Sequence, residues 1–142
     1  MIPPAMPDVE TVSPKHRTCA LGLGCRSGAT ADELIALAET ALRQASLGRE
    51  ALGVIASFEA RRNDPGIAAV ARHFGLPAVF YDAARLEMET PRLKTPSASV
   101  FAAIGCHGVA ESAALAAAGP AAVLVLAKIR SGQATAAIAG EP

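Results

Sequence analysis

Hydrophobic residues along the chain follow two alternating patterns: short continuous apolar runs, and longer segments with apolar positions three or four residues apart. Short apolar runs bounded by glycine, proline or polar residues are typical of buried strands. We expect strands at residues 18–23, 51–56, 78–81, 122–126 and 134–138.

The segments with helical spacing begin with capping signals. Thr30 is followed three residues later by Glu33, which is the pattern of a capping box at a helix start. Asp64-Pro65 pairs a preferred N-cap residue with proline at the first helical position. We expect helices at residues 30–48, 64–75, 82–88, 97–104 and 109–118.

The alternation of strands and helices predicts a single α/β domain with a mostly parallel five-stranded sheet and helices on both faces. The last strand follows a tight turn at Ser131-Gly132, so we expect it antiparallel to the fourth strand and at an edge of the sheet. Residues 17–142 would form this domain, and the proline-rich residues 1–16 a disordered arm. Ligands of open parallel sheets bind beyond the carboxyl ends of the strands, which directs the search to the loops after residues 22, 56, 81 and 126.

Composition and charge exclude several classes of protein. The chain has 142 residues, of which 51% are hydrophobic but only 4% aromatic. Its 13 basic and 13 acidic residues balance, which argues against a nucleic-acid partner. Three cysteines without paired spacing argue against a disulfide framework and favour the cytoplasm. We see no signal peptide, no apolar run that would span a membrane and no metal-ligand spacing.

A glycine-rich loop joins the first predicted strand to the first helix. Gly22, Gly24 and Gly28 permit close approach of the backbone to a ligand, and the helix N-terminus that follows favours an anion. Cys25 and Arg26 lie within this loop, and the guanidinium adds a fixed cation. The spacing is one residue longer than the dinucleotide fingerprint, so we expect no nicotinamide cofactor. A purely structural turn would use the same glycines.

Further cations are expected at the same edge of the sheet. In the polar segment from Ser57 to Asp64, Arg61 can pair with a carboxylate, although a solvated loop and a helix cap also account for this segment. Lys128 follows the fourth strand and is either a ligand contact or an ordinary hairpin lysine. Together they predict a basic rim suited to a ligand with several carboxylates. Its other expected members are Arg26 and, from a loop predicted to be mobile, Arg92 and Lys94.

The turn Gly105-Cys106-His107-Gly108 precedes the last predicted helix and places Glu111 in its first turn. His107 and Glu111 are candidates for acid–base catalysis. Each also has a simpler interpretation, because a first-turn glutamate complements the helix dipole and a histidine suits a polar turn. Cys106 beside His107 is a weak candidate for a thiol–base pair, because neighbours in sequence rarely point together.

Taken together, these motifs resemble the CobE family, which is similar to the C-terminal domain of CbiG. The resemblance covers about residues 18–138, and the motifs keep their order. The family often has lysine at the position of Arg61 and glutamate at that of Asp64, so charge pairing is retained here but a lysine-specific proton transfer is not. The matching motifs are 22–28 with Glu33, 57–66, Pro96-Ser97, 105–111 and Lys128.

The resemblance implies a role in cobalamin (vitamin B12) biosynthesis, with a precorrin or other corrinoid intermediate as ligand and other pathway enzymes as possible partners. Our leading hypothesis is that a basic, glycine-lined cleft binds this intermediate. The alternatives are a hydrolase or isomerase acting on a precorrin, with Glu111 or His107 as the acid or base, or a structural partner of another pathway enzyme. The residues expected to bind the ligand are Gly22, Gly24, Cys25, Arg26, Gly28, Ser57, Arg61, Asp64, Ser97, Gly105 and Lys128.

Overall fold

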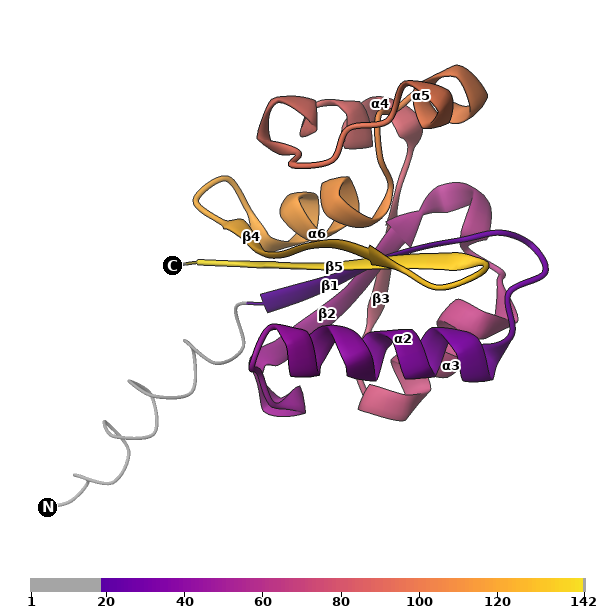
Figure 1. The fold of residues 1–142 in the computed structure, drawn as a ribbon, viewed down its shortest axis with the longest axis vertical. Helices are drawn as coiled ribbons and strands as arrows, with labels where there is room; N and C mark the ends of the chain where they lie inside the picture. The colour runs from indigo at the N-terminus through magenta and orange to yellow at the C-terminus, as the bar shows by residue number, and fades with distance from the viewer. Residues whose placement is uncertain (1–18, 142) are drawn as a thin grey trace, which may run out of the picture.

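The computed structural model describes residues 19–141, so the arm predicted at residues 1–16 lies outside the described residues. The chain forms one five-stranded sheet with helices packed on it (Figure 1). The strands are β1 (Cys19–Cys25), β2 (Leu52–Phe58), β3 (Ala78–Tyr81), β4 (Val123–Arg130) and β5 (Ala134–Gly140).

Helices begin at each of the four predicted side-chain caps. Side-chain oxygens of Thr30, Asp64, Asp82 and Ser97 each accept a hydrogen bond from a backbone N–H in the first turn of the helix that follows. Short 3-10 turns lie at Arg49–Ala51, Glu59–Arg61 and Thr90–Arg92. The α-helices are α2 (Ala31–Gln44), α3 (Pro65–Phe74), α4 (Ala83–Glu87), α5 (Ala98–Ile104) and α6 (Ala110–Ala118).

The order of the strands in the sheet is β3-β2-β1-β5-β4. Strands β1, β2 and β3 pair in parallel, and β5 pairs antiparallel with both β1 and β4. Four strands therefore run in one direction and the last is antiparallel, as predicted. The placement of the last strand at an edge is wrong, because β5 lies between β1 and β4. Its alanine-rich sequence is buried on both faces, whereas Val123 and Val125 of β4 are 47% and 41% exposed, as suits an edge strand.

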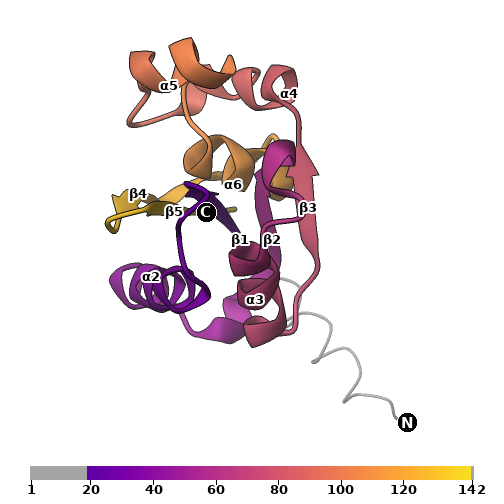
Figure 2. The same ribbon diagram turned by 90° about the vertical axis from the view of Figure 1, so that its right-hand side faces the viewer.

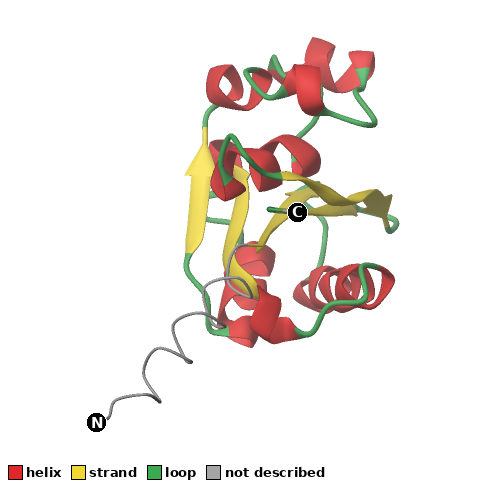
Figure 3. Ribbon diagram, turned by 90° about the vertical axis from the view of Figure 1, so that its left-hand side faces the viewer, coloured by secondary structure: helices red, strands yellow, loops and turns green. Residues whose placement is uncertain are grey.

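Helices cover both faces of the sheet, as the sequence predicted (Figures 2 and 3). Helices α2 and α3 lie side by side on one face. Helix α6 covers the other face, and α4 and α5 lie outside it as an additional layer (Figures 1 and 2). Within residues 19–141, no helix is both long and apolar enough to cross a bilayer.

Helix α6 lies unusually close to strand β1. At Gly22 an added Cβ would collide with the carbonyl oxygen of Ala110 and would lie 2.8 Å from the amide nitrogen of Ala114. The absence of a side chain at Gly22 therefore lets the two backbones meet. Because of this contact, the N-terminus of α6 lies beside the carboxyl end of β1, where a ligand site is expected.

Candidate ligand-binding site

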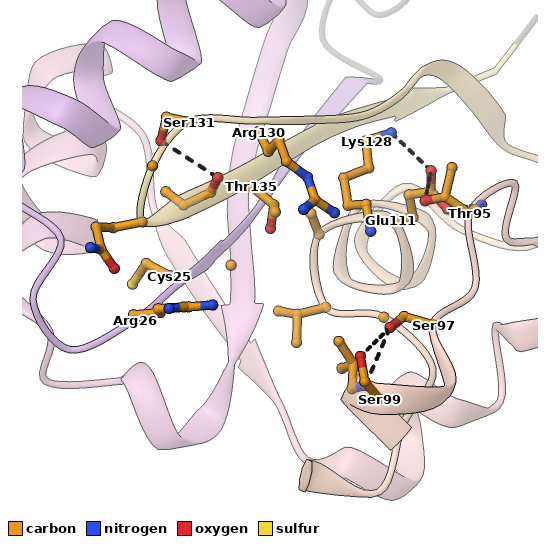
Figure 4. A pocket seen from close by; sticks show the side chains of 18 residues that line it. Cys25, Arg26, Thr95, Ser97, Ser99, Glu111, Lys128, Arg130, Ser131 and Thr135 are labelled. Carbon is orange, nitrogen blue, oxygen red and sulfur yellow. Dashed lines mark hydrogen bonds between the residues drawn. The ribbon is translucent and has the colours of Figure 1, made fainter. Parts of the chain in front are cut away.

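A cleft of about 320 Å³ opens at the carboxyl end of β1, where the parallel part of the sheet meets the β4–β5 hairpin (Figure 4). This is the edge of the sheet to which the strand-end rule directed the search. Its walls come from the end of β1, the hairpin, the segment leading into α5 and the start of α6. The polar and charged residues in its lining are Cys25, Arg26, Thr95, Ser97, Ser99, Glu111, Lys128, Arg130, Ser131, Gln133 and Thr135.

Three cationic side chains surround the cleft. Arg26 follows β1, and Lys128 and Arg130 belong to β4; Figure 4 shows the two arginines extending into the cleft from its two sides. Among the described residues, no carboxylate lies within ion-pair distance of these three groups. Three cations against one lining carboxylate, Glu111, give the cleft an excess of positive charge, which favours an anionic ligand.

The cleft also contains a carboxylate, Glu111, but its oxygens are fully engaged. Oε1 accepts from the backbone N–H groups of Lys94 and Thr95, both at 3.0 Å. Oε2 accepts from the Thr95 hydroxyl at 3.0 Å and from the Lys128 backbone N–H at 2.8 Å. Burial raises the pKa of this carboxyl, but the hydrogen bonds outweigh burial and leave the pKa below its ordinary value. Glu111 is thus an ionised anchor that joins α6 to β4 and to the 94–95 segment.

The same contact shapes strand β4. The pairing of β4 with β5 is irregular between Leu126 and Ile129, and within this bulge the Lys128 N–H turns to Glu111. The strand continues to Arg130 instead of ending at residue 126 as predicted. Lys128 therefore lies within the strand and not after it. Because residues two apart share a face of a strand, Arg130 joins Lys128 at the cleft.

The N-terminus of α6 forms another wall of the cleft. Gly108, Val109 and Ala110 line it, and the N-cap residue Val109 has no side-chain oxygen to satisfy the first-turn N–H groups. These groups carry the positive end of the helix dipole. Next to this N-terminus, the Ser97 N–H donates to the His107 carbonyl at 2.8 Å, and the Ser97 and Ser99 hydroxyls lie 3.0 Å apart. Figure 4 shows these two serines close together. The arrangement offers N–H and O–H donors beside the cations.

Glu33 supports the hairpin that carries Arg130. Its carboxylate accepts hydrogen bonds from the Ser131 hydroxyl and from the Gln133 N–H, the latter at 2.7 Å. These two hydrogen bonds lower the pKa of Glu33, and the bond from Ser131 has the larger effect. The capping box was therefore only half correct, because Thr30 accepts from the Glu33 N–H while the Glu33 side chain reaches the hairpin.

A second lobe of about 230 Å³ adjoins the first and shares Gly24, Cys25 and Val109 with it. Here the Cys25 thiol lies 3.7 Å from an Asp64 oxygen. Burial, followed by the Asp64 charge, raises the pKa of Cys25 to about 11, although Arg61 acts in the opposite direction. The thiol is therefore protonated at neutral pH and is a poor nucleophile. The other residues of this lobe are Phe58, Ala60, Arg61 and Ile104.

Seven of the residues predicted to bind or act on a ligand line these two lobes. The glycine loop proved to be partly strand, because β1 extends to Cys25. At Gly24 an added Cβ would lie 2.7 Å from the Thr135 hydroxyl oxygen, so this glycine keeps the floor of the cleft open. The seven residues are Gly24, Cys25, Arg26, Arg61, Ser97, Glu111 and Lys128.

The remaining predicted residues lie outside both lobes, and most of them have structural contacts. Gly22 lies beneath α6, and Gly28 is exposed with open space around it. Ser57 belongs to β2 and is fully buried, and its hydroxyl donates to the Leu23 carbonyl at 2.6 Å. Asp64 caps α3 through the Gly66 N–H at 2.8 Å. Gly105 ends α5 with φ of 87°, a left-handed conformation that favours glycine.

His107 also lies outside both lobes. Its ring nitrogen Nδ1 lies 2.9 Å from a Glu87 oxygen, and its ring stacks on Phe101 with 4.4 Å between centroids. Arg92 does not join the predicted basic rim, because it binds the buried Glu89 and donates to the Ala122 carbonyl at 2.7 Å. These contacts hold the segment that was predicted to be mobile.

Several lining residues were missed by the sequence analysis, notably Arg130, Gln133 and Thr135. Arg130 could have been found from the sequence, because it lies two residues after Lys128 and would share its face of the strand if the predicted strand were extended to residue 130. The hairpin and β5 residues had no such signal, since they reach the cleft only because β5 lies next to β1. In the part of the chain that the structure describes, no group of three or more His, Cys, Asp or Glu side chains could hold a metal ion.

Comparison with known proteins gives a consistent result. Residues 19–139 match the family model described as Cobalamin synthesis G C-terminus. The chain is 56% identical over 120 residues to Protein CobE of Sinorhizobium sp, covering 84% of this chain and 78% of that protein. The fold is similar to the crystal structure of CobE, a protein from the cobalamin biosynthetic pathway, with a TM-score of 0.78 and 36% identity over 85% of this chain and 88% of that one.

The chain is also similar to part of a longer enzyme. It is 29% identical over 125 residues to the Cobalt-precorrin-5A hydrolase of Priestia megaterium. This match covers 88% of the chain but only 33% of the hydrolase.

Proposed function

The chain belongs to the CobE family of cobalamin biosynthesis, related to the C-terminal domain of CbiG, and from this premise we propose that its cleft binds a corrinoid intermediate of the pathway. The observation that carries the proposal is the group of three cations, Arg26, Lys128 and Arg130, that lacks carboxylate partners among the described residues. Corrin intermediates carry acetate and propionate groups around the ring. A cleft with excess positive charge is suited to such a ligand.

The proposed contacts follow from the chemistry of each group. The guanidinium groups of Arg26 and Arg130 would bind carboxylates with paired N–H donors, and Lys128 would act as a point charge. The first-turn N–H groups of α6 would add donors for a further carboxylate oxygen. At about 320 Å³ the cleft would receive one edge of the macrocycle and its acidic arms, with the rest of the ring remaining outside.

A hydrolase is the second candidate, and the similarity to Cobalt-precorrin-5A hydrolase favours it. The geometry supports binding more strongly than hydrolysis. Glu111 has both oxygens occupied by donors and a lowered pKa, so it is a weak proton acceptor. His107 pairs with Glu87 outside the cleft, and the Cys25 thiol is protonated at neutral pH. We therefore propose binding without turnover.

The test compares an acidic corrinoid with its ester. Dicyanocobyrinic acid and its heptamethyl ester share the ring and differ in the charge of their arms. Titration of the purified protein, followed by the visible spectrum and by calorimetry, should show the acid binding at least tenfold more tightly than the ester. Added salt should weaken binding of the acid, because exposed charges are screened.

Single substitutions then test whether Arg130 contacts the ligand. Arg130→Met should weaken binding of the acid about tenfold, as expected for loss of one charge-assisted hydrogen-bond pair. Arg43→Met is the matched control, because Arg43 lies in the last turn of α2 and lines neither lobe. Equal affinity for acid and ester, or no binding of the acid at high micromolar concentration, would overturn the proposal.

A further inference from the structure

The second lobe differs in chemistry from the first. The side chains of Phe58, Ile104 and Val109 make it mainly apolar, and Arg61 is its one charged lining residue. We infer that this lobe receives a single alkyl carboxylate arm of the ligand, with the methylene groups against the apolar side chains and the carboxylate on Arg61. The inference rests on the proposed function only in taking the whole ligand to be a corrinoid. The site for an alkyl carboxylate does not depend on it.

Two neighbouring arginines have different surroundings. Arg62 lies over the ring of Phe80 at 5.0 Å and lines neither lobe. Arg61 lines the second lobe, and within residues 19–141 it has no ion pair. The nearby carboxylate, Asp64, accepts from the N–H groups of Gly66 and Ile67, so it serves the N-terminus of α3. Arg61 is thus available to a ligand.

The two lobes lie next to each other. Gly24, Cys25 and Val109 line both, so a ligand that reaches across these residues would contact both lobes. At Gly24 an added Cβ would lie 3.4 Å from the Val109 Cβ and still closer to Thr135, which would narrow the junction. One molecule with several acidic arms can therefore meet the Arg130 side of the cleft and Arg61 at the same time. Two contacts within one ligand strengthen binding beyond either alone.

The chemistry of the lobe selects among small groups. An apolar wall stabilises methylene groups by removing them from water. A guanidinium favours a carboxylate over a neutral amide, because opposite charges attract and the two carboxylate oxygens can accept a pair of parallel N–H donors. The lobe, at about 230 Å³, is smaller than the first and suits an arm better than a ring.

The first experiment needs no corrinoid. Hexanoate and hexanamide are titrated into the isotope-labelled protein, and backbone amide shifts are followed by NMR. Hexanoate should shift the amides of Phe58, Ala60 and Ile104, with hexanamide at least tenfold weaker. Arg61→Met should weaken hexanoate binding at least tenfold, whereas the matched control Arg62→Met should leave it unchanged. Equal binding of acid and amide, equal effects of the two variants, or shifts confined to other residues would overturn the inference.

The second experiment separates this inference from the proposed function. Hexanoate should compete with dicyanocobyrinic acid, and Arg61→Met should weaken corrinoid binding several-fold more than Arg62→Met. If the corrinoid binds but neither effect occurs, the inference fails and the proposed function stands. If hexanoate binds the lobe as expected but the corrinoid does not bind, the proposed function fails and the alkyl carboxylate site stands.

Discussion

The two faces of the sheet are packed with different kinds of side chain. The α2–α3 face has large aliphatic residues, whereas the buried residues beneath and around α6 are mainly alanine. On the first face the largest buried side chains include Leu21, Leu23, Leu34, Leu37, Leu42, Ile55, Ile67, Val70 and Ile138. On the second, the buried alanines are Ala56, Ala110, Ala113, Ala114, Ala137 and Ala139.

Because of this difference, the α2–α3 face mainly stabilises the fold, whereas the α6 face mainly positions the site. Large side chains remove more apolar area from water, so the α2–α3 face contributes most of the hydrophobic stabilisation. Small side chains contribute less area but let the backbone of α6 approach β1 closely, which brings its N-terminus to the cleft. Leu21 and Gly22 are neighbours in sequence but belong to opposite faces, because side chains alternate along a strand. Substitutions at these two positions test the division directly.

The largest effect on stability is expected at Leu21. Leu21→Ala would leave a cavity beneath α2 and should lower the free energy of unfolding by about 4 kcal/mol. The measurement is urea unfolding followed by circular dichroism. Affinity for dicyanocobyrinic acid, measured well below the midpoint, should stay within about twofold of wild type. A large loss of affinity in protein that remains folded would show that the α2–α3 face also positions the site.

A smaller loss of stability, with a larger effect on the site, is expected at Gly22. Gly22→Ala adds one methyl group that must push α6 away from β1, at a cost of about 3 kcal/mol. Gly28→Ala is the control, because nothing lies within 4 Å of the added Cβ, and its cost should be below about 0.5 kcal/mol. Corrinoid affinity should fall in the Gly22 variant and not in the control. Similar unfolding curves for the two variants would contradict the close packing of α6.

The smallest of the three effects is expected at Glu111, the polar anchor on the α6 face. Glu111→Gln would leave buried N–H donors poorly paired and should cost about 2 kcal/mol at pH 7. Because the folded pKa is below the ordinary value of 4.5, the carboxylate stabilises the fold above that value, and this contribution is lost as the pH falls through the folded pKa.

The difference in stability between wild type and Glu111→Gln should therefore be greatest at neutral pH and should shrink below about pH 4.5. Urea unfolding at a series of pH values measures it. A difference that is constant with pH would show that the anchor does not depend on the charge of Glu111.

The candidate site was only partly predictable from the sequence. Arg26, Arg61 and Lys128 were expected because each lies close to the end of a predicted strand, and strand ends meet at one edge. Glu111 was noted but its role was not, since its partners at residues 94, 95 and 128 are distant along the chain. Arg130 was missed because the bulged strand continues beyond its purely apolar part.

The sequence by itself determined the order and type of the elements and the N-caps at Thr30, Asp64, Asp82 and Ser97, because hydrophobic periodicity and N-cap hydrogen bonds act over a few residues. Only the tertiary structure decided that β5 lies inside the sheet, that α6 touches β1 at Gly22, and that the cations gather around one cleft without carboxylate partners among the described residues. These outcomes depend on contacts between residues far apart in the chain. Several arrangements of the elements fit the local sequence patterns equally well, and packing and burial determine which of them has the lowest free energy.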